Sequence, residues 1–149
     1  MTIREYRPAD CEESAELFYN TVHTVSAGDY TEAQLDAWAA EDMDLERWNR
    51  SLLEHDCLVA VENGVIIGFG DLAGAGYLDR LYVHKDYQRM GVGSAICGRL
   101  EQAARGKIVT HASITARPFF EKRGYKVVRE QQVMRRGITL TNFVMEKQE

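Results

Sequence analysis

The stretch from Leu81 to Arg105 combines a strand, a glycine-containing turn and a helix, and it constrains the fold of this chain more than any other segment. It opens on a β-rich run at residues 81–83, and the turn at residues 88–93 has the spacing Gln-x-x-Gly-x-Gly. Apolar residues then recur at helical spacing, at Val92, Ile96, Leu100 and Ala103. The pattern predicts a strand whose tight turn opens an amphipathic helix.

This turn has the composition of an anion site. The first N–H groups of a helix have no partner inside it, and the helix dipole is positive at that end. Gly91 and Gly93 would let those groups approach a phosphate without an intervening Cβ, and Arg89 adds a positive charge. The turn is not a P-loop, because no Gly-Lys-Ser/Thr follows, and it lacks the third glycine of the dinucleotide fingerprint. Taken alone, it also fits a plain connection between a strand and a helix.

A second motif at residues 113–125 reads Ser-Ile-Thr-Ala-Arg-Pro-Phe-Phe-Glu-Lys-Arg-Gly-Tyr. Residues 88–93 resemble the acyl-CoA-binding motif of the GNAT N-acetyltransferase superfamily. Residues 113–125 resemble that superfamily's motif Asn-x-x-Ala-x-x-Phe-Tyr-x-x-x-Gly-Phe. The ending from Gln131 to Met145 resembles the YafP-like branch of bacterial acetyltransferases. The resemblance covers essentially the whole chain.

The resemblance implies acetyl-CoA as cosubstrate. Amides from Arg89 to Ser94 would hold the pyrophosphate, and the main chain of Leu81 and Val83 would pair with the pantetheine arm like an added strand. An amide near Leu81 or Tyr82 would polarise the thioester carbonyl. The acyl-CoA-binding residues expected in this way are Leu81, Tyr82, Val83, Gln88, Arg89, Met90, Gly91, Val92, Gly93, Ser94, Ser113, Phe119, Phe120 and Lys122.

The catalytic candidates lie on the strand expected at residues 77–83. Period-2 alternation predicts Tyr77, Asp79, Leu81 and Val83 on one face, and Leu78, Arg80 and Tyr82 on the other. Asp79 is the favoured general base or water anchor, while Tyr77 aligns best by spacing with an acidic position of the superfamily. The alternative is that Asp79 only forms a structural ion pair with a cation such as Arg80 or Lys85.

Phe120 stands where many members have a tyrosine that protonates the departing thiolate, and a phenyl ring has no proton to give. Tyr82, Tyr125 and Tyr30 are conceivable substitutes. Two other functions therefore stay open: a module that binds acyl-CoA without transferring it, and a generic binder of nucleotide phosphates.

The acceptor side is expected near Tyr30 and Trp38, which flank a capping box, Thr31 to Gln34, that opens a helix. Both aromatic residues either pack in the core or line the acceptor site. The acceptor itself would be a small-molecule or peptide amine, which the sequence does not specify.

Composition narrows the partners and the compartment. The 149 residues suit one N-acetyltransferase domain, residues 1–149, and a net charge of −5 argues against nucleic acid or an anionic membrane. No apolar run reaches membrane length, and no signal-peptide pattern is present. Three widely spaced cysteines suit a reducing cytoplasm, and the four histidines have no metal-ligand spacing, so no metal is expected. The superfamily resemblance makes a homodimer possible.

Interleaved strands and helices indicate an α/β (α+β) domain with a mixed sheet. The resemblance implies a mostly antiparallel central sheet flanked by helices. That sheet would splay around the acyl-CoA site, between the strand that ends at Val83 and the strand that starts near Lys107.

Overall fold

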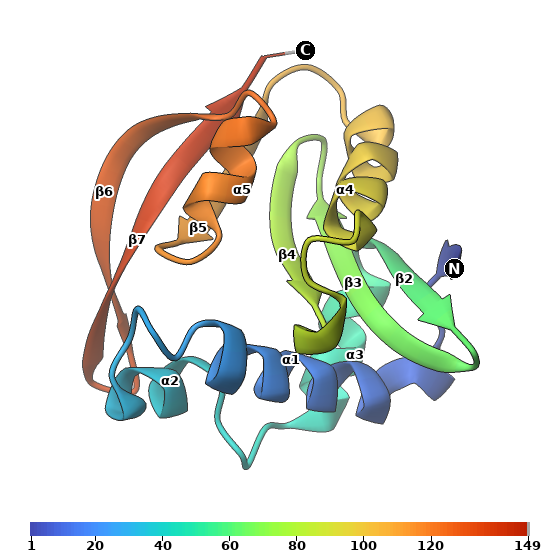
Figure 1. Ribbon diagram of the computed structural model, residues 1–149, viewed down its shortest axis with the longest axis horizontal. Coiled ribbons are helices and arrows are strands. Elements are labelled where there is room, and N and C mark those ends of the chain that lie inside the picture. Colours follow the sequence, from blue (N-terminus) through green and yellow to red (C-terminus); the bar gives the residue numbers. More distant parts are fainter. Residues whose placement is uncertain (149) are drawn as a thin grey trace.

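The computed structural model describes residues 1–148 and contains one sheet with helices on both faces (Figure 1). The strands are β1 (Thr2–Glu5), β2 (Asp56–Glu62), β3 (Val65–Ala73), β4 (Tyr77–Val83), β5 (Ile108–Ser113), β6 (Lys126–Arg135) and β7 (Ile138–Lys147). The helices are α1 (Cys11–Val25), α2 (Glu32–Trp38), α3 (Leu45–Leu53), α4 (Val92–Ala103) and α5 (Arg117–Lys122), with short 3-10 turns η1 (Pro8–Asp10) and η2 (Lys85–Tyr87).

The sheet has seven strands in the order β1-β2-β3-β4-β5-β7-β6, and every neighbouring pair except one is antiparallel. The exception is the parallel contact between β4 and β5, which consists of Tyr77 opposite Val109 and Leu78 opposite Thr110. Beyond that contact the two strands diverge (Figure 1). The predicted class, a mixed and mostly antiparallel sheet splayed at this point, is confirmed.

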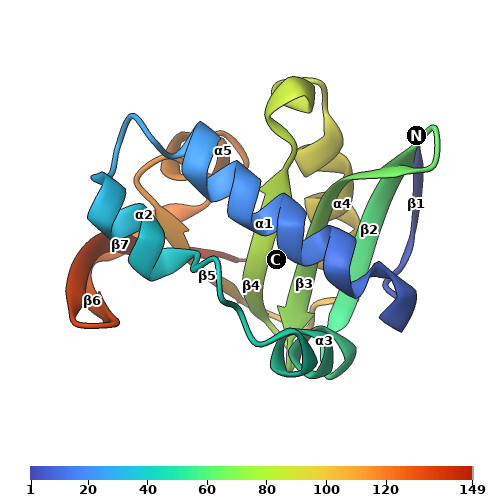
Figure 2. The same cartoon turned by 90° about the horizontal axis from the view of Figure 1, so that it is seen from below.

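Two hydrophobic clusters fix the helices to opposite faces of the sheet. On one face, Ile96 and Leu100 of α4 are buried against the sheet. On the other, Phe18 of α1 and Leu52 of α3 pack with Phe69 of β3. Figure 2 shows α1, α2 and α3 together on the near side, with α4 behind the strands.

Local sequence signals account for several boundaries. The predicted capping box is confirmed, because Gln34 N–H donates to Thr31 Oγ1 at 3.2 Å and Thr31 N–H donates to Gln34 Oε1 at 2.9 Å. The turn between β2 and β3 has positive φ at Asn63 and Gly64, as an Asn-Gly hairpin requires.

The predicted alternation along β4 is wrong, because the strand contains a β-bulge. Arg80 is paired with Asp71 and Leu78 with Leu72, so Asp79 is an extra residue outside the ladder. A bulge places two residues opposite one and re-aims the side chains around it. As a result, Asp79 and Tyr82 line the same cavity, while Leu81 packs with the core under α4.

Candidate active site

The glycine turn delivers a helix N-terminus to the surface beside β4. Gly91 is the N-cap of α4 and has a φ of +85°, which explains its glycine. A Cβ there would meet no protein atom within 4 Å, so the need for glycine comes from backbone conformation and an open approach. Gln88 Nε2 donates to Val83 O at 2.6 Å and ties the turn to the end of β4.

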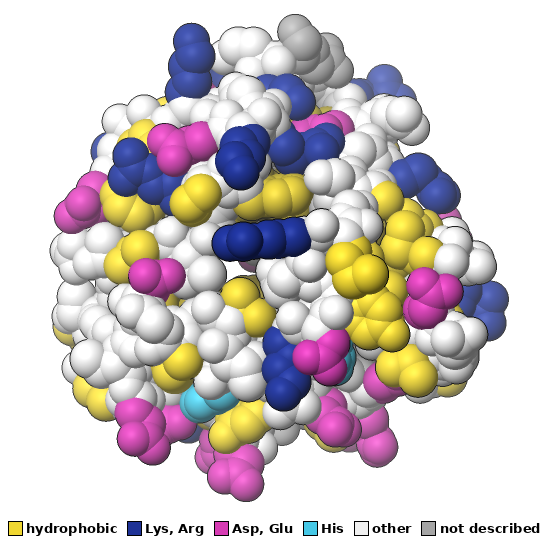
Figure 3. All heavy atoms as spheres, viewed as in Figure 1, with side chains coloured by type: hydrophobic (Ala, Val, Ile, Leu, Met, Phe, Trp, Pro, Cys, Tyr) yellow, Lys and Arg dark blue, Asp and Glu magenta, His cyan; other side chains and the backbone are white. Residues whose placement is uncertain are grey.

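The surface around this turn carries positive charge. Arg89 and Met90 are exposed in the turn, and Lys122 is exposed at the end of α5. Figure 3 shows Lys and Arg side chains over α5 and across the hollow between α5 and α4. The helix N-terminus and these cations together suit a phosphate-containing ligand.

The backbone of β4 offers unpaired groups to the splayed side. His84 N–H donates to Ile67 O at 2.8 Å, so the antiparallel ladder makes Tyr82 face β3 and turns the N–H groups of Leu81 and Val83 away from it. A cavity of about 140 Å³ lies here, between β4 and the segment that leads into α5. Predicted acyl-CoA residues that line it are Leu81, Tyr82, Val83, Gln88, Gly93, Ser113, Phe119 and Phe120.

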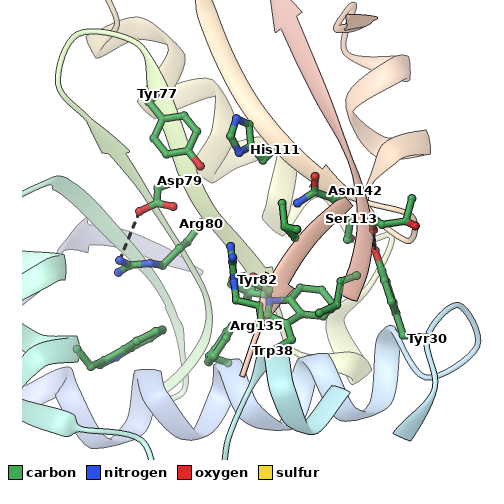
Figure 4. A pocket seen from close by; sticks show the side chains of 15 residues that line it. Tyr30, Trp38, Tyr77, Asp79, Arg80, Tyr82, His111, Ser113, Arg135 and Asn142 are labelled. Carbon is green, nitrogen blue, oxygen red and sulfur yellow. Dashed lines mark hydrogen bonds and ion pairs between the residues drawn. The ribbon is translucent and has the colours of Figure 1, made fainter. Parts of the chain in front are cut away.

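A second cavity, of about 250 Å³, lies on the other side of Tyr82 and is drawn in Figure 4. Trp38, Tyr82 and Ser113 line both cavities, so the two meet at these residues. Tyr77 and Asp79 project into the second cavity from β4 (Figure 4). The structure therefore brings the predicted base next to the predicted acyl-CoA cleft.

Tyr30 has a structural role that uses its hydroxyl group fully. The residue is 7% exposed, donates to Thr141 O at 2.6 Å and accepts from Ile114 N–H at 2.9 Å. It thus ties the loop before α2 to β7 and to the end of β5, while its ring lines the second cavity. Both interpretations of Tyr30, core packing and cavity lining, are correct.

Trp38 is half-buried and lines both cavities beside Tyr82. Its ring centroid is 5.4 Å from that of Tyr30 and 6.4 Å from that of Tyr82. Its position favours the lining interpretation.

The possible acids differ sharply in position. Tyr125 is 2% exposed and donates to Glu101 Oε2 at 2.7 Å, so it packs under α4 and lines neither cavity. Tyr82 lines both, and burial raises the pKa of its phenol well above the usual range. Burial also raises the pKa of Tyr77 to about 12. Both phenols therefore stay protonated at neutral pH, which suits a proton donor and not a base.

A charged network that the sequence did not reveal surrounds Asp79. Asp71 of β3 is fully buried, and its Oδ2 lies 2.7 Å from His55 Nδ1 and 3.3 Å from Arg80 Nη1. Asp79 Oδ2 lies 3.4 Å from Arg80 Nη2, which confirms the predicted ion pair, and 3.9 Å from His55 Nδ1. Asp79 thus forms that ion pair and also faces the cavity. The signal in the sequence was the acid of Asp71 inside an otherwise apolar strand.

The same network is the one group of potential metal ligands found within residues 1–148. Nitrogen and oxygen atoms of His55, Asp71 and Asp79 lie within 4.8 Å of one another. The Arg80 guanidinium contacts both carboxylates, so a fixed cation already neutralises them. The absence of a metal stays a prediction.

Two further residues of the second cavity were missed. His111 of β5 stacks edge-on against Tyr77 with ring centroids 5.2 Å apart, and burial, with help from Arg129, lowers the pKa of His111. It is therefore neutral at pH 7 and could accept a proton. Arg135 at the end of β6 lines the cavity from a hairpin that has no motif of its own.

Comparison with known proteins agrees with this geometry. The family described as acetyltransferase (GNAT) domain matches residues 26–147. The chain is 36% identical over 143 residues to the uncharacterized N-acetyltransferase YafP of Escherichia coli, covering 96% of this chain and 93% of that protein. It is 33% identical over 129 residues to the L-amino acid N-acyltransferase MnaT of Escherichia coli, covering 76% and 70%.

A crystal structure titled as a GCN5-related N-acetyltransferase from Rhodopseudomonas palustris superimposes with a TM-score of 0.96 at 34% identity, covering 99% of this chain and 95% of that one. The chain belongs to the GNAT acetyltransferase family and, within it, to the YafP-like branch. It is accordingly an acetyl-CoA-dependent N-acyltransferase. Within residues 1–148, no helix has the length and apolar character needed to span a membrane.

Proposed function

We propose that the protein transfers an acetyl group from acetyl-CoA to a primary amine that carries a carboxylate. The observation that supports this most is the meeting of two cavities at Tyr82. One leads from the α4 N-terminus along β4, and the other contains Asp79.

The donor side suits CoA. The free amides at the start of α4 would hold the pyrophosphate, and the Leu81 and Val83 backbone would pair with the pantetheine arm. Because Tyr82 faces β3 in the ladder, the Leu81 amide is the better candidate to polarise the thioester carbonyl. Ser113 Oγ accepts from Ala116 N–H at 3.0 Å and keeps its own proton for a hydrogen bond to the arm.

On the acceptor side, the reaction needs a neutral amine. An ammonium group would give one proton to Asp79, directly or through water, and its nitrogen would then attack the thioester carbon. The carbon–sulfur bond breaks as the amide forms, and the thiolate takes the proton that the nitrogen loses. Tyr82 is the proposed donor to sulfur, because its phenol is protonated and borders both cavities.

The carboxylate of the acceptor follows from Arg135. Its guanidinium donates to Met134 O at 3.3 Å, and no carboxylate among residues 1–148 forms an ion pair with it. Figure 4 labels Asp79 and Arg135 on the same cavity, one offering an anion and the other a cation. A zwitterion matches both, and MnaT is described as acting on L-amino acids.

The test is a panel of amines assayed for acetyl-CoA-dependent thiol release. Each amino acid is paired with its own amide, which keeps the amine and removes the carboxylate. We expect the free acids to turn over faster, and Arg135→Met to abolish that preference. Equal rates for acids and amides would contradict the carboxylate assignment.

The same panel tests the other functions. Binding of CoA in a calorimeter without thiol release from any amine would favour the binding module. Competition by ATP as strong as by CoA would favour a generic phosphate binder. We also propose a single domain, a cytoplasmic setting and a homodimer; light scattering of the purified protein tests the last.

A further inference from the structure

We propose that His55 is the proton outlet of this active site: a positioning residue that shares the acceptor's proton with Asp79 and releases it to solvent. The proposal rests on the proposed function, since it assumes that Asp79 takes the amine proton. Nothing in the sequence motifs involves His55, which lies in the turn between α3 and β2.

The first argument is the path. Asp79 faces the acceptor cavity, which a bound amine would fill, so its proton has no free route back through that opening. His55 Nδ1 is 3.9 Å from Asp79 Oδ2, yet His55 is not among the residues that line the cavity. Its side chain is 18% exposed, so the ring reaches solvent on the other side of the network. A proton can therefore arrive on the Nδ1 side and leave from Nε2.

The second argument is charge. Asp71 and Asp79 are two carboxylates against one permanent cation, Arg80, so the network accepts one further proton at neutral charge. Asp71 is fully buried, its Oδ1 has no hydrogen-bond partner within residues 1–148, and burial raises the pKa of its carboxyl group. One proton already lies between Asp71 and His55 Nδ1, at 2.7 Å. A second proton makes the imidazolium and balances the network.

The third argument is that the neighbouring groups do not replace His55. The titratable and charged groups around it are Asp71 from β3, Asp79 and Arg80 from β4, and, next to Asp71, Cys57 from β2 and Tyr77. Burial raises the pKa of the Cys57 thiol and of Tyr77, so neither exchanges a proton near pH 7. Arg80 stays charged, because a guanidinium is not deprotonated in proteins. His55 is left as the group that both titrates near neutrality and reaches water.

In proton balance, one proton leaves the amine nitrogen and one is released to water at Nε2 in each turnover. His55, Asp71 and Asp79 end in the states in which they began. No oxidant, metal or second substrate is needed.

The test uses His55→Asn, because the asparagine amide can still donate to Asp71 where Nδ1 does but cannot titrate. We expect kcat to fall about tenfold or more, since a general acid–base step contributes roughly 10²–10⁴-fold. The KM for acetyl-CoA should stay unchanged. Added imidazole should restore part of the rate in His55→Asn and change little in the natural protein. The control is His23→Asn, since His23 is also 18% exposed but hydrogen-bonds to Ala39 O elsewhere.

Wild-type kcat, pH profile and imidazole response in His55→Asn would overturn the proposal. A second readout needs no turnover: NMR titration of the His55 ring, assigned by its loss in His55→Asn. In Asp79→Asn the midpoint should move to lower pH, because a carboxylate that favours the imidazolium has gone. An unchanged midpoint would also overturn the proposal, whereas failure of every amine to react would count only against the proposed function.

Discussion

Gly93, in the first turn of α4, faces the ring of Phe119 on α5: a Cβ at residue 93 would stand 3.4 Å from Phe119 Cε1. The same Cβ would be 3.5 Å from Val83 Cγ2 at the end of β4. The glycine turn and the second sequence motif are therefore in direct contact, and the strand between the two cavities joins them. Changes in either motif should act on the same cleft.

Gly91→Val should weaken CoA binding at least about a hundredfold. Valine is strained at a φ of +85° and blocks the approach to the amides, with a loss of two charge-assisted hydrogen bonds of roughly 1.5–3 kcal/mol each. Calorimetry with CoA measures the effect, with Gly93→Ala as control, because its Cβ makes only ordinary contacts. Near-normal affinity in a folded Gly91→Val protein would rule out the phosphate assignment.

Asp79→Asn should lower kcat by roughly 10²–10⁴-fold with little change in CoA affinity. A base acts as its carboxylate, so activity is lost as pH falls, and the asparagine variant should lack that acid limb. A pH–rate profile measures it, with exposed Asp42→Asn as control. His111→Asn is the informative comparison, because a limb lost in that variant and kept in Asp79→Asn would make His111 the base.

Phe120→Tyr should raise turnover by less than about tenfold. A thiol has a pKa of roughly 8.5, so the thiolate leaves tolerably well without an acid at residue 120. Phe120→Ala should instead cost about 3–5 kcal/mol of stability, because the ring is 3% exposed and packs on Tyr125. Steady-state rates and urea unfolding separate the two effects. A gain of two orders of magnitude in Phe120→Tyr would show that the missing acid limits the natural protein.

Asp10→Asn should destabilise the fold by about 1–3 kcal/mol at pH 7. The Asp10 carboxylate accepts from Arg4 Nη1 at 2.8 Å and from Arg4 Nη2 at 3.0 Å, and these hydrogen bonds lower its pKa. A lowered folded-state pKa gives stability that is present above the unfolded value, about 3.9, and is lost as pH falls through the folded value. Urea unfolding of both proteins should therefore converge in acid; a constant difference would exclude the ion pair as the cause.

Chelation should leave turnover unchanged, because Arg80 already balances the carboxylates beside His55. Dialysis against EDTA followed by the thiol-release assay tests this, with elemental analysis of the protein before and after treatment. A loss of activity that added zinc restores would replace the proposed ionic network with a metal site.

Periodic signals in the sequence were enough for most of the fold. The helix that begins after Gly91 and the Asn63-Gly64 hairpin each depend on residues close together in the chain, which local rules describe well. The bulge at Asp79 was beyond such rules, because an extra residue in a strand leaves no mark in a two-residue alternation. The contact of His55 with Asp71 joins residues 16 positions apart in sequence, on different elements, and needs the register of β3 against β4.

The short contact between β4 and β5 makes the sheet behave as two plates joined at one edge. Two residue pairs at Tyr77 and Leu78 form that seam, and Tyr30 bolts the plates together on the far side. The Leu81 and Val83 amides between seam and bolt have no partner strand, so they should exchange with deuterated water faster than the rest of β4. A pantetheine arm paired to them would slow that exchange, and the stiffness of the sheet would then depend on its own cosubstrate.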